Sequence, residues 1–91
     1  MKQLEKEFTG RGQVKDFEFK QMIETNLGFI YEVNTGVSKY YEVFKRKENT
    51  LYNCISYPSN KAFGIWAWTC FDLGKAAARL ESFKEAEKIE S

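Results

Sequence analysis

The clearest structural pattern of the chain is in residues 17–47, FEFKQMIETNLGFIYEVNTGVSKYYEVFKRK. It opens with apolar and charged side chains on alternating positions: Phe17, Phe19 and Ile23 on one parity, and Glu18, Lys20 and Glu24 on the other. This alternation is typical of a β-strand with one buried face. Two turn signals follow, NLG at 26–28 and NTG at 34–36, whose Asn and Gly residues adopt positive φ readily. The stretch therefore predicts three consecutive strands joined by tight turns.

Toward the C-terminus, two more strand-like segments are expected at 51–57 and 61–70. The only proline, Pro58, separates them, and Gly64 inside the second segment indicates a bulge or a close backbone approach. Successive strands separated by short turn signals favour antiparallel neighbours over parallel βαβ units.

The period of the pattern changes after residue 70. Asp72 is a suitable N-cap for a helix. Apolar residues then recur at helical spacing: Leu73, Ala76, Ala77, Leu80 and Phe83. The expected fold class is therefore α+β, an antiparallel meander sheet of four to five strands with one C-terminal amphipathic helix packed on one face.

The chain of 91 residues has the size of one domain. Residues 1–12 are expected to form a polar N-terminal arm or a short helical turn, which ends at the Gly10-Arg-Gly12 segment. Residues 13–91 are expected to form the single domain of β-meander and helix.

Composition limits the classes of function. The net charge is +1, from 14 basic and 13 acidic residues, so no overall field indicates nucleic acid or a membrane surface as a partner. No signal-peptide pattern and no apolar run of about 18 residues is found, so we expect a cytoplasmic protein without a membrane partner. Cys54 and Cys70 do not form a CxxC pair and are expected to be reduced, buried thiols.

The sequence has no histidine, which removes the commonest general base and most zinc-binding arrangements. Two isolated cysteines do not make a structural zinc site. We therefore expect no enzyme activity, no cofactor and no metal.

The tryptophans raise the question of a binding surface. One helix covers one face of a sheet, yet apolar residues occur on both parities of several strands. If the helix lies over Phe63, Ile65 and Ala67, then Trp66 and Trp68 point to the opposite face. Exposed aromatic residues of this kind mark a binding surface. The alternative is a strongly curled sheet that encloses both tryptophans in one core.

The expected binding surface combines aromatic rings with basic side chains: Trp66, Trp68, Tyr40, Phe44, Lys45, Arg46, Lys47 and Lys61. The favoured function is a non-catalytic binding module that associates with another protein chain, either as a homodimer or with a target protein, because aromatic residues and arginine are enriched in interface hot spots. The alternative is single-stranded DNA or RNA binding, with bases stacked on the rings and a basic rim following the phosphates.

Overall fold

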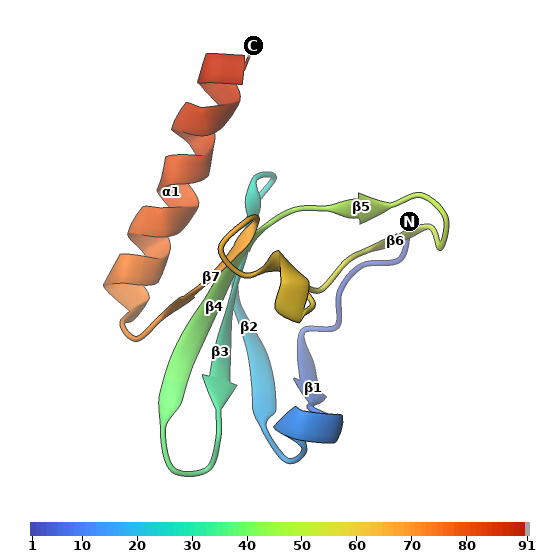
Figure 1. Ribbon diagram of the computed structural model, residues 1–91, viewed down its shortest axis with the longest axis vertical. Helices are drawn as coiled ribbons and strands as arrows, with labels where there is room; N and C mark the ends of the chain where they lie inside the picture. The colour runs from blue at the N-terminus through green and yellow to red at the C-terminus, as the bar shows by residue number, and fades with distance from the viewer. Residues whose placement is uncertain (91) are drawn as a thin grey trace.

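The structure is a computed structural model that describes the backbone of residues 1–90 and the side chains of residues 1–84, so residue 91 of the expected domain lies outside the described residues. A five-stranded antiparallel sheet carries one C-terminal helix against one face (Figure 1). The strand order is β1 (Glu7–Thr9), β2 (Glu18–Glu24), β3 (Gly28–Asn34), β4 (Lys39–Lys45) and β7 (Ala67–Cys70), followed by α1 (Leu73–Glu90). The predicted α+β fold is confirmed.

The centre of the sheet is the meander predicted from residues 17–47. β3 pairs with β2 on one side and with β4 on the other, and Tyr31 lies opposite Glu42 in the second pair. The turn between β3 and β4 is closed by Asn34, whose side-chain oxygen accepts a hydrogen bond from the Gly36 N–H at 2.9 Å. Gly36 has a φ of 94°, a conformation that glycine adopts without steric cost.

The N-terminal residues add a strand that the sequence pattern did not predict. Where the pattern favoured a polar arm or a helical turn, β1 forms the edge of the sheet and pairs with β2, with Phe8 opposite Phe19. A 3-10 turn, η1 (Gly12–Val14), then reverses the chain into β2. Leu4 and Phe8, four residues apart, both pack against the core from this extended segment.

Residues 46–66 leave the sheet instead of adding a full strand to it. They form a small hairpin of β5 (Glu48–Asn49) and β6 (Cys54–Ile55), then the 3-10 turn η2 (Asn60–Ala62). The expected strands at 51–57 and 61–70 are thus reduced to their residues 54–55 and 67–70. Gly64, with a φ of 88°, turns the chain back so that β7 pairs with β4.

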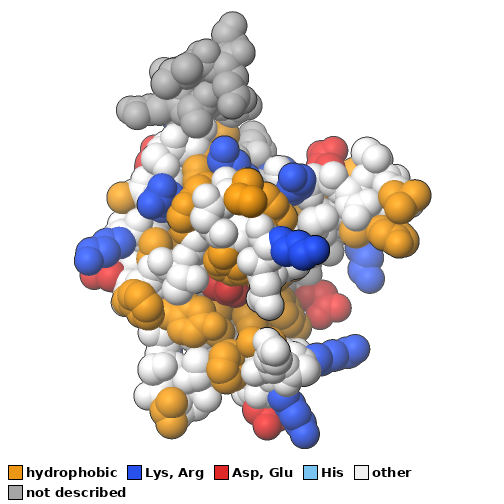
Figure 2. Space-filling view, viewed as in Figure 1, with side chains coloured by type: hydrophobic (Ala, Val, Ile, Leu, Met, Phe, Trp, Pro, Cys, Tyr) orange, Lys and Arg blue, Asp and Glu red, His pale blue; other side chains and the backbone are white. Residues whose placement is uncertain are grey.

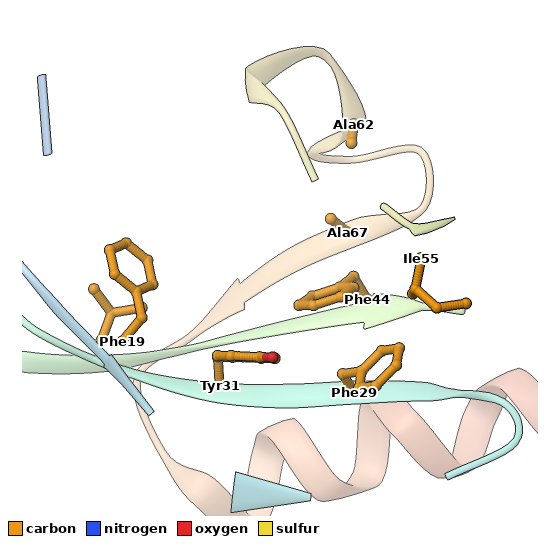
Figure 3. Close-up of a cluster of buried hydrophobic side chains, with 8 residues drawn as sticks. Phe19, Phe29, Tyr31, Phe44, Ile55, Ala62 and Ala67 are labelled. Carbon is orange, nitrogen blue, oxygen red and sulfur yellow. The ribbon is translucent and has the colours of Figure 1, made fainter. Parts of the chain in front are cut away.

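Both faces of the sheet are buried. On the helix face, Ile30 and Val43 pack against Ala76, Leu80 and Phe83 of α1. The other side, which we call the loop face, carries a larger cluster beneath the N-terminal segment and residues 46–66 (Figure 3). Its buried members are Phe19, Phe29, Tyr31, Val33, Phe44, Ile55, Ala62 and Ala67. Two covered faces explain why apolar residues occur on both parities of β3 and β4.

The helix begins as its sequence predicts. The Asp72 side-chain oxygen accepts a hydrogen bond from the Lys75 N–H at 3.1 Å, which satisfies one of the free donors of the first turn. Within the described part of the chain, α1 does not have the apolar length that a membrane-crossing helix requires.

Candidate functional site

The two tryptophans lie on opposite sides of the sheet. Trp68 is on the helix face, where its ring centroid lies 5.4 Å from that of Phe83. Trp66 packs on the loop-face cluster, 6.3 Å from the Phe44 ring. Ala67, not Trp68, points into the loop face, so the expected assignment of parities in β7 is reversed.

Trp66 escapes the alternation because it precedes the strand. Its N–H donates a hydrogen bond to the Ala62 carbonyl at 2.9 Å, as part of the turn that follows η2. The strand begins at Ala67, directly after Trp66 and not at residue 61 as the sequence pattern suggests, so the common face expected for the two tryptophans is not formed.

The other predicted aromatic residues also differ in accessibility. Phe44 is completely buried in the loop-face cluster. Tyr40 is half-buried, with its ring 6.5 Å from the exposed ring of Phe71.

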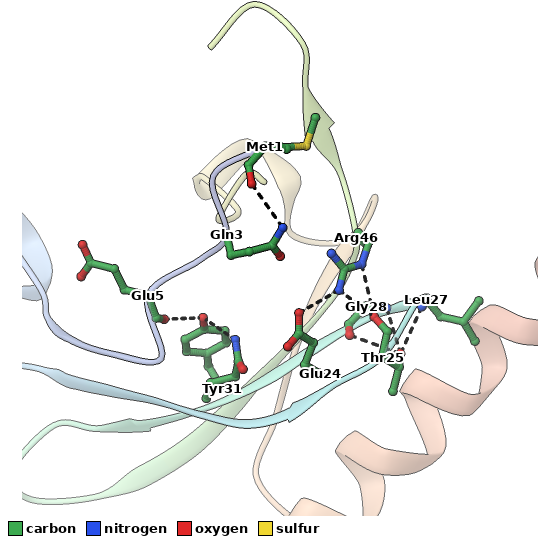
Figure 4. A network of polar contacts seen from close by, with 10 residues as sticks. Met1, Gln3, Glu5, Glu24, Thr25, Leu27, Gly28, Tyr31 and Arg46 are labelled. Atoms are coloured by element: carbon green, nitrogen blue, oxygen red, sulfur yellow. Dashed lines mark hydrogen bonds and ion pairs between the residues drawn. The ribbon is translucent and has the colours of Figure 1, made fainter. Parts of the chain in front are cut away.

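The basic residues of the predicted rim are distributed over both faces. Lys45 lies over the Phe83 ring at 5.7 Å, and Lys47 lies over the Trp66 ring at 5.3 Å. Arg46 lies 4.7 Å from the Phe29 centroid and forms a 3.0 Å ion pair with Glu24 (Figure 4). Lys61 is exposed on η2. Three of these four cations thus lie over rings of the chain itself.

A pocket of about 560 Å³ opens on the loop face. It lies between the N-terminal segment, β6 and the residues that lead into η2, and its floor is the sheet. Aromatic side chains line it from several elements: Phe8, Phe19, Tyr57 and Phe63. In Figure 2, hydrophobic side chains gather across the middle of the view, and acidic atoms show between them. Four charged residues also line the pocket: Lys2, Glu5, Arg11 and Glu42.

Glu42 differs from the other charged residues of the pocket because it is buried. It comes from the centre of β4, and its exposed fraction is 8%, whereas Lys2, Glu5 and Arg11 are exposed. Its Oε1 accepts a hydrogen bond from the Tyr57 hydroxyl at 2.7 Å. Burial raises the pKa of the Glu42 carboxyl above its ordinary value, and the Tyr57 bond partly opposes that rise in pKa.

Tyr57 is held by rings on several sides. Its centroid lies 4.9 Å from Phe44, 5.2 Å from Tyr31 and 5.4 Å from Phe8, all in edge-to-face geometry. Burial and then the nearby Glu42 carboxylate raise the pKa of Tyr57, so its hydroxyl keeps its proton and remains a donor.

The N-terminal wall of the pocket is fixed to the sheet by polar contacts. The Tyr31 hydroxyl donates to the Glu5 carbonyl at 2.6 Å and accepts from the Gln21 amide at 3.0 Å (Figure 4). Lys2 forms an isolated backbone β-bridge with Cys54 of β6, and its backbone N–H donates to the Asn53 carbonyl at 2.9 Å. These contacts hold residues 1–6 beside the β5–β6 hairpin.

The turn of this hairpin carries two exposed apolar side chains. Leu51 is 82% exposed and Tyr52 is 73% exposed, and Met1 is also partly exposed beside Lys2. Because β6 contributes Cys54 and Ile55 to the pocket lining, the hairpin links this exposed turn to the pocket. We call Leu51 and Tyr52 the hairpin tip.

Sequence reasoning did not find Glu42 and Tyr57 as a pair. The sequence does hold a hint of a buried carboxylate, because Glu42 shares its side of the predicted strand with Tyr40 and Phe44. The contact with Tyr57 spans 15 residues and depends on how residues 46–66 fold back. Among the described residues, no group of three or more carboxylate or thiol side chains is placed to hold a metal ion.

Comparison with known proteins adds no relative to this description: no protein-family model, no curated protein and no solved structure gives a significant match to the chain.

Proposed function

We propose that this chain is a non-catalytic binding module of the cytoplasm, and that its partner is another protein. The partner contacts the loop-face side of the molecule, where the pocket and the hairpin tip lie. The observation that carries the proposal is the pocket itself, which combines aromatic walls with a buried carboxylate. Binding sites are commonly concave and apolar, with a few fixed polar groups.

The hairpin tip supports a macromolecular partner. Leu51 and Tyr52 expose most of their apolar surface on a hairpin that needs neither side chain for its own core. Tyrosine is enriched at interface hot spots because its ring buries area while its hydroxyl stays paired or hydrated. A partner that covers the tip and enters the pocket removes this surface from water.

The basic residues of the predicted rim give less support to single-stranded nucleic acid as the partner. Arg46 is engaged by Glu24 and by the Thr25 carbonyl, at 3.0 and 3.1 Å from its Nη2. Phe44 is buried, and Lys45 and Lys47 lie on different faces of the sheet. A continuous basic track beside exposed rings, which is the usual arrangement in such proteins, is not formed by these residues.

The proposal is tested by site-specific photo-crosslinking in the native host. A photoreactive amino acid replaces Tyr52 at the hairpin tip, and in a matched variant it replaces Glu81, an exposed residue of α1. We expect a discrete crosslinked protein from position 52 and none from position 81. A product of twice the mass of this chain identifies a homodimer.

Equal crosslinking from both positions, or none from position 52, contradicts the proposal. So does tight binding of a mixed-sequence oligonucleotide that weakens steeply between low and moderate salt, because that dependence indicates phosphate contacts. The oligonucleotide is titrated while the tryptophan fluorescence of the protein is recorded.

A further inference from the structure

We propose that the loop-face pocket receives an ammonium group, carried by a lysine or methyl-lysine side chain of the partner protein, and that Glu42 is its counter-ion. This inference rests on the proposed function, because it names the chemistry that the pocket recognises in the partner.

The Glu42 carboxylate has one oxygen that is bonded to Tyr57 and one that is not. Its Oε1 is bonded to Tyr57, whereas Oε2 has no hydrogen-bond partner among the described residues. Every fully buried side-chain nitrogen or oxygen of the described residues does have a partner, so Oε2 is not sealed inside the protein. Glu42 lines the pocket, and Oε2 therefore faces the pocket space.

The charge of Glu42 favours a cation in the pocket. A buried carboxylate without a positive partner is unfavourable, and an incoming cation compensates it. The other charged residues that face the pocket are Lys2, Glu5 and Arg11, all of them exposed, so water screens their fields much more strongly than that of Glu42. An anion would be repelled at the floor of the pocket, and a neutral group would leave the charge uncompensated.

The aromatic side chains around the carboxylate favour an ammonium group. Phe8, Phe19, Tyr57 and Phe63 line the same space as the carboxylate. The faces of aromatic rings attract ammonium groups, and this attraction strengthens when water is excluded. The pocket volume of about 560 Å³ leaves room for the backbone beside the lysine, which favours a peptide over a free metal ion.

The test uses three small probes on the isotope-labelled full chain, followed by NMR. They are a lysine with both backbone ends blocked, the same compound trimethylated at Nε, and the same compound acetylated at Nε. We expect the two charged probes to shift the amide signals of Tyr57 and of β4. The acetylated probe, which keeps the length but loses the charge, is expected to bind at least about tenfold more weakly.

The decisive variant is Glu42→Gln, which keeps an oxygen acceptor for Tyr57 and removes the charge. We expect affinity for the charged probes to fall by about tenfold. Glu32→Gln is the matched control, because Glu32 lies on the neighbouring strand opposite Tyr41, on the helix side of the sheet. The affinity of Glu32→Gln for the charged probes is expected to equal that of the unsubstituted protein.

The unsubstituted protein gives an independent readout if Glu42→Gln does not fold. Probe affinity is expected to rise with pH as the Glu42 carboxyl, followed through its side-chain carbon signal, loses its proton. Equal binding of the acetylated probe, unchanged affinity in Glu42→Gln, a flat pH profile, or shifts outside the pocket would each overturn the inference. Crosslinking at position 52 without cation binding defeats only this inference. Cation binding without crosslinking defeats the proposed protein partner and leaves Glu42 as the counter-ion of an ammonium group from another source.

Discussion

At the scale of single residues, Glu42 and Tyr57 are the pair whose chemistry is most altered by the fold. The carboxyl lies opposite Tyr31 in the middle of the sheet, and the phenol reaches it from a loop 15 residues later. Burial raises the pKa of both groups. In addition, the hydrogen bond from Tyr57 opposes the rise in the pKa of Glu42, and the Glu42 carboxylate raises the pKa of Tyr57 further.

The raised pKa of Glu42 predicts how stability depends on pH. The folded protein holds this proton more tightly than the unfolded chain, so unfolding releases it. The contribution of Glu42 to the free energy of unfolding is thus fully present below its ordinary pKa of 4.5, and it is lost as pH rises through the raised pKa of the folded state. We expect Glu42→Gln to remove this part of the pH dependence and to be more stable than the unsubstituted protein at neutral pH. Urea unfolding across a pH series measures both, and a less stable Glu42→Gln at neutral pH contradicts the prediction.

The hydroxyl of Tyr57 is tested by Tyr57→Phe, which keeps the ring among its neighbours. We expect a loss of about 1–3 kcal/mol in the free energy of unfolding, because the carboxylate loses its donor. The pKa of Glu42 is expected to rise further, since the hydrogen bond now lowers it. Tyr52→Phe makes the same chemical change at an exposed position and should alter stability little. Equal stability of the two variants would show that the bond to Glu42 contributes nothing.

At the scale of elements, the helix depends on close approach to the sheet. Ala76 is completely buried against Ile30 and Val43, and a larger side chain there would force α1 away. We expect Ala76→Leu to lower the free energy of unfolding by about 1–3 kcal/mol, the usual cost of overpacking. Ala78→Leu, on the exposed side of the same helix, should change it by less than about 0.5 kcal/mol. Thermal or urea unfolding compares the two, and similar losses would mean that helix packing does not limit stability.

At the scale of the whole molecule, the hairpin tip lies apart from the two buried clusters. The buried clusters lie on the two faces of the sheet, whereas the hairpin tip projects away from both (Figure 1). The double substitution of Leu51 and Tyr52 by serine is therefore expected to leave the unfolding midpoint nearly unchanged. It should weaken association with the protein captured from position 52 by at least about tenfold, since a few anchor residues, tyrosine prominent among them, carry most of the binding energy at an interface.

That association is measured by titrating the identified partner into the purified variant. Val37, almost fully exposed at the β3–β4 turn, provides the control substitution Val37→Ser, which should retain full affinity. A double-serine variant with unchanged affinity would place the interface elsewhere on the molecule.

The local sequence pattern was sufficient for the meander and the helix. Alternation in residues 17–47 and the Asn-Gly turns define β2, β3 and β4, because side-chain period and turn chemistry act over a few residues. Asp72 and the spacing of Ala76, Leu80 and Phe83 define the start and the buried face of α1 for the same reason.

The cover of the second face and the position of the pocket depend on contacts between distant parts of the chain. The sequence pattern predicts the segments 51–57 and 61–70 as strands, but residues 46–66, which contain Pro58 and Gly64 and contact the N-terminal segment, form a cover over the loop face. That cover buries Phe44, separates Trp66 from Trp68 and brings Tyr57 to Glu42. Contacts between residues far apart in the chain leave no periodic trace in the sequence, since they are set by how whole segments pack and not by the conformational preference of any one of them.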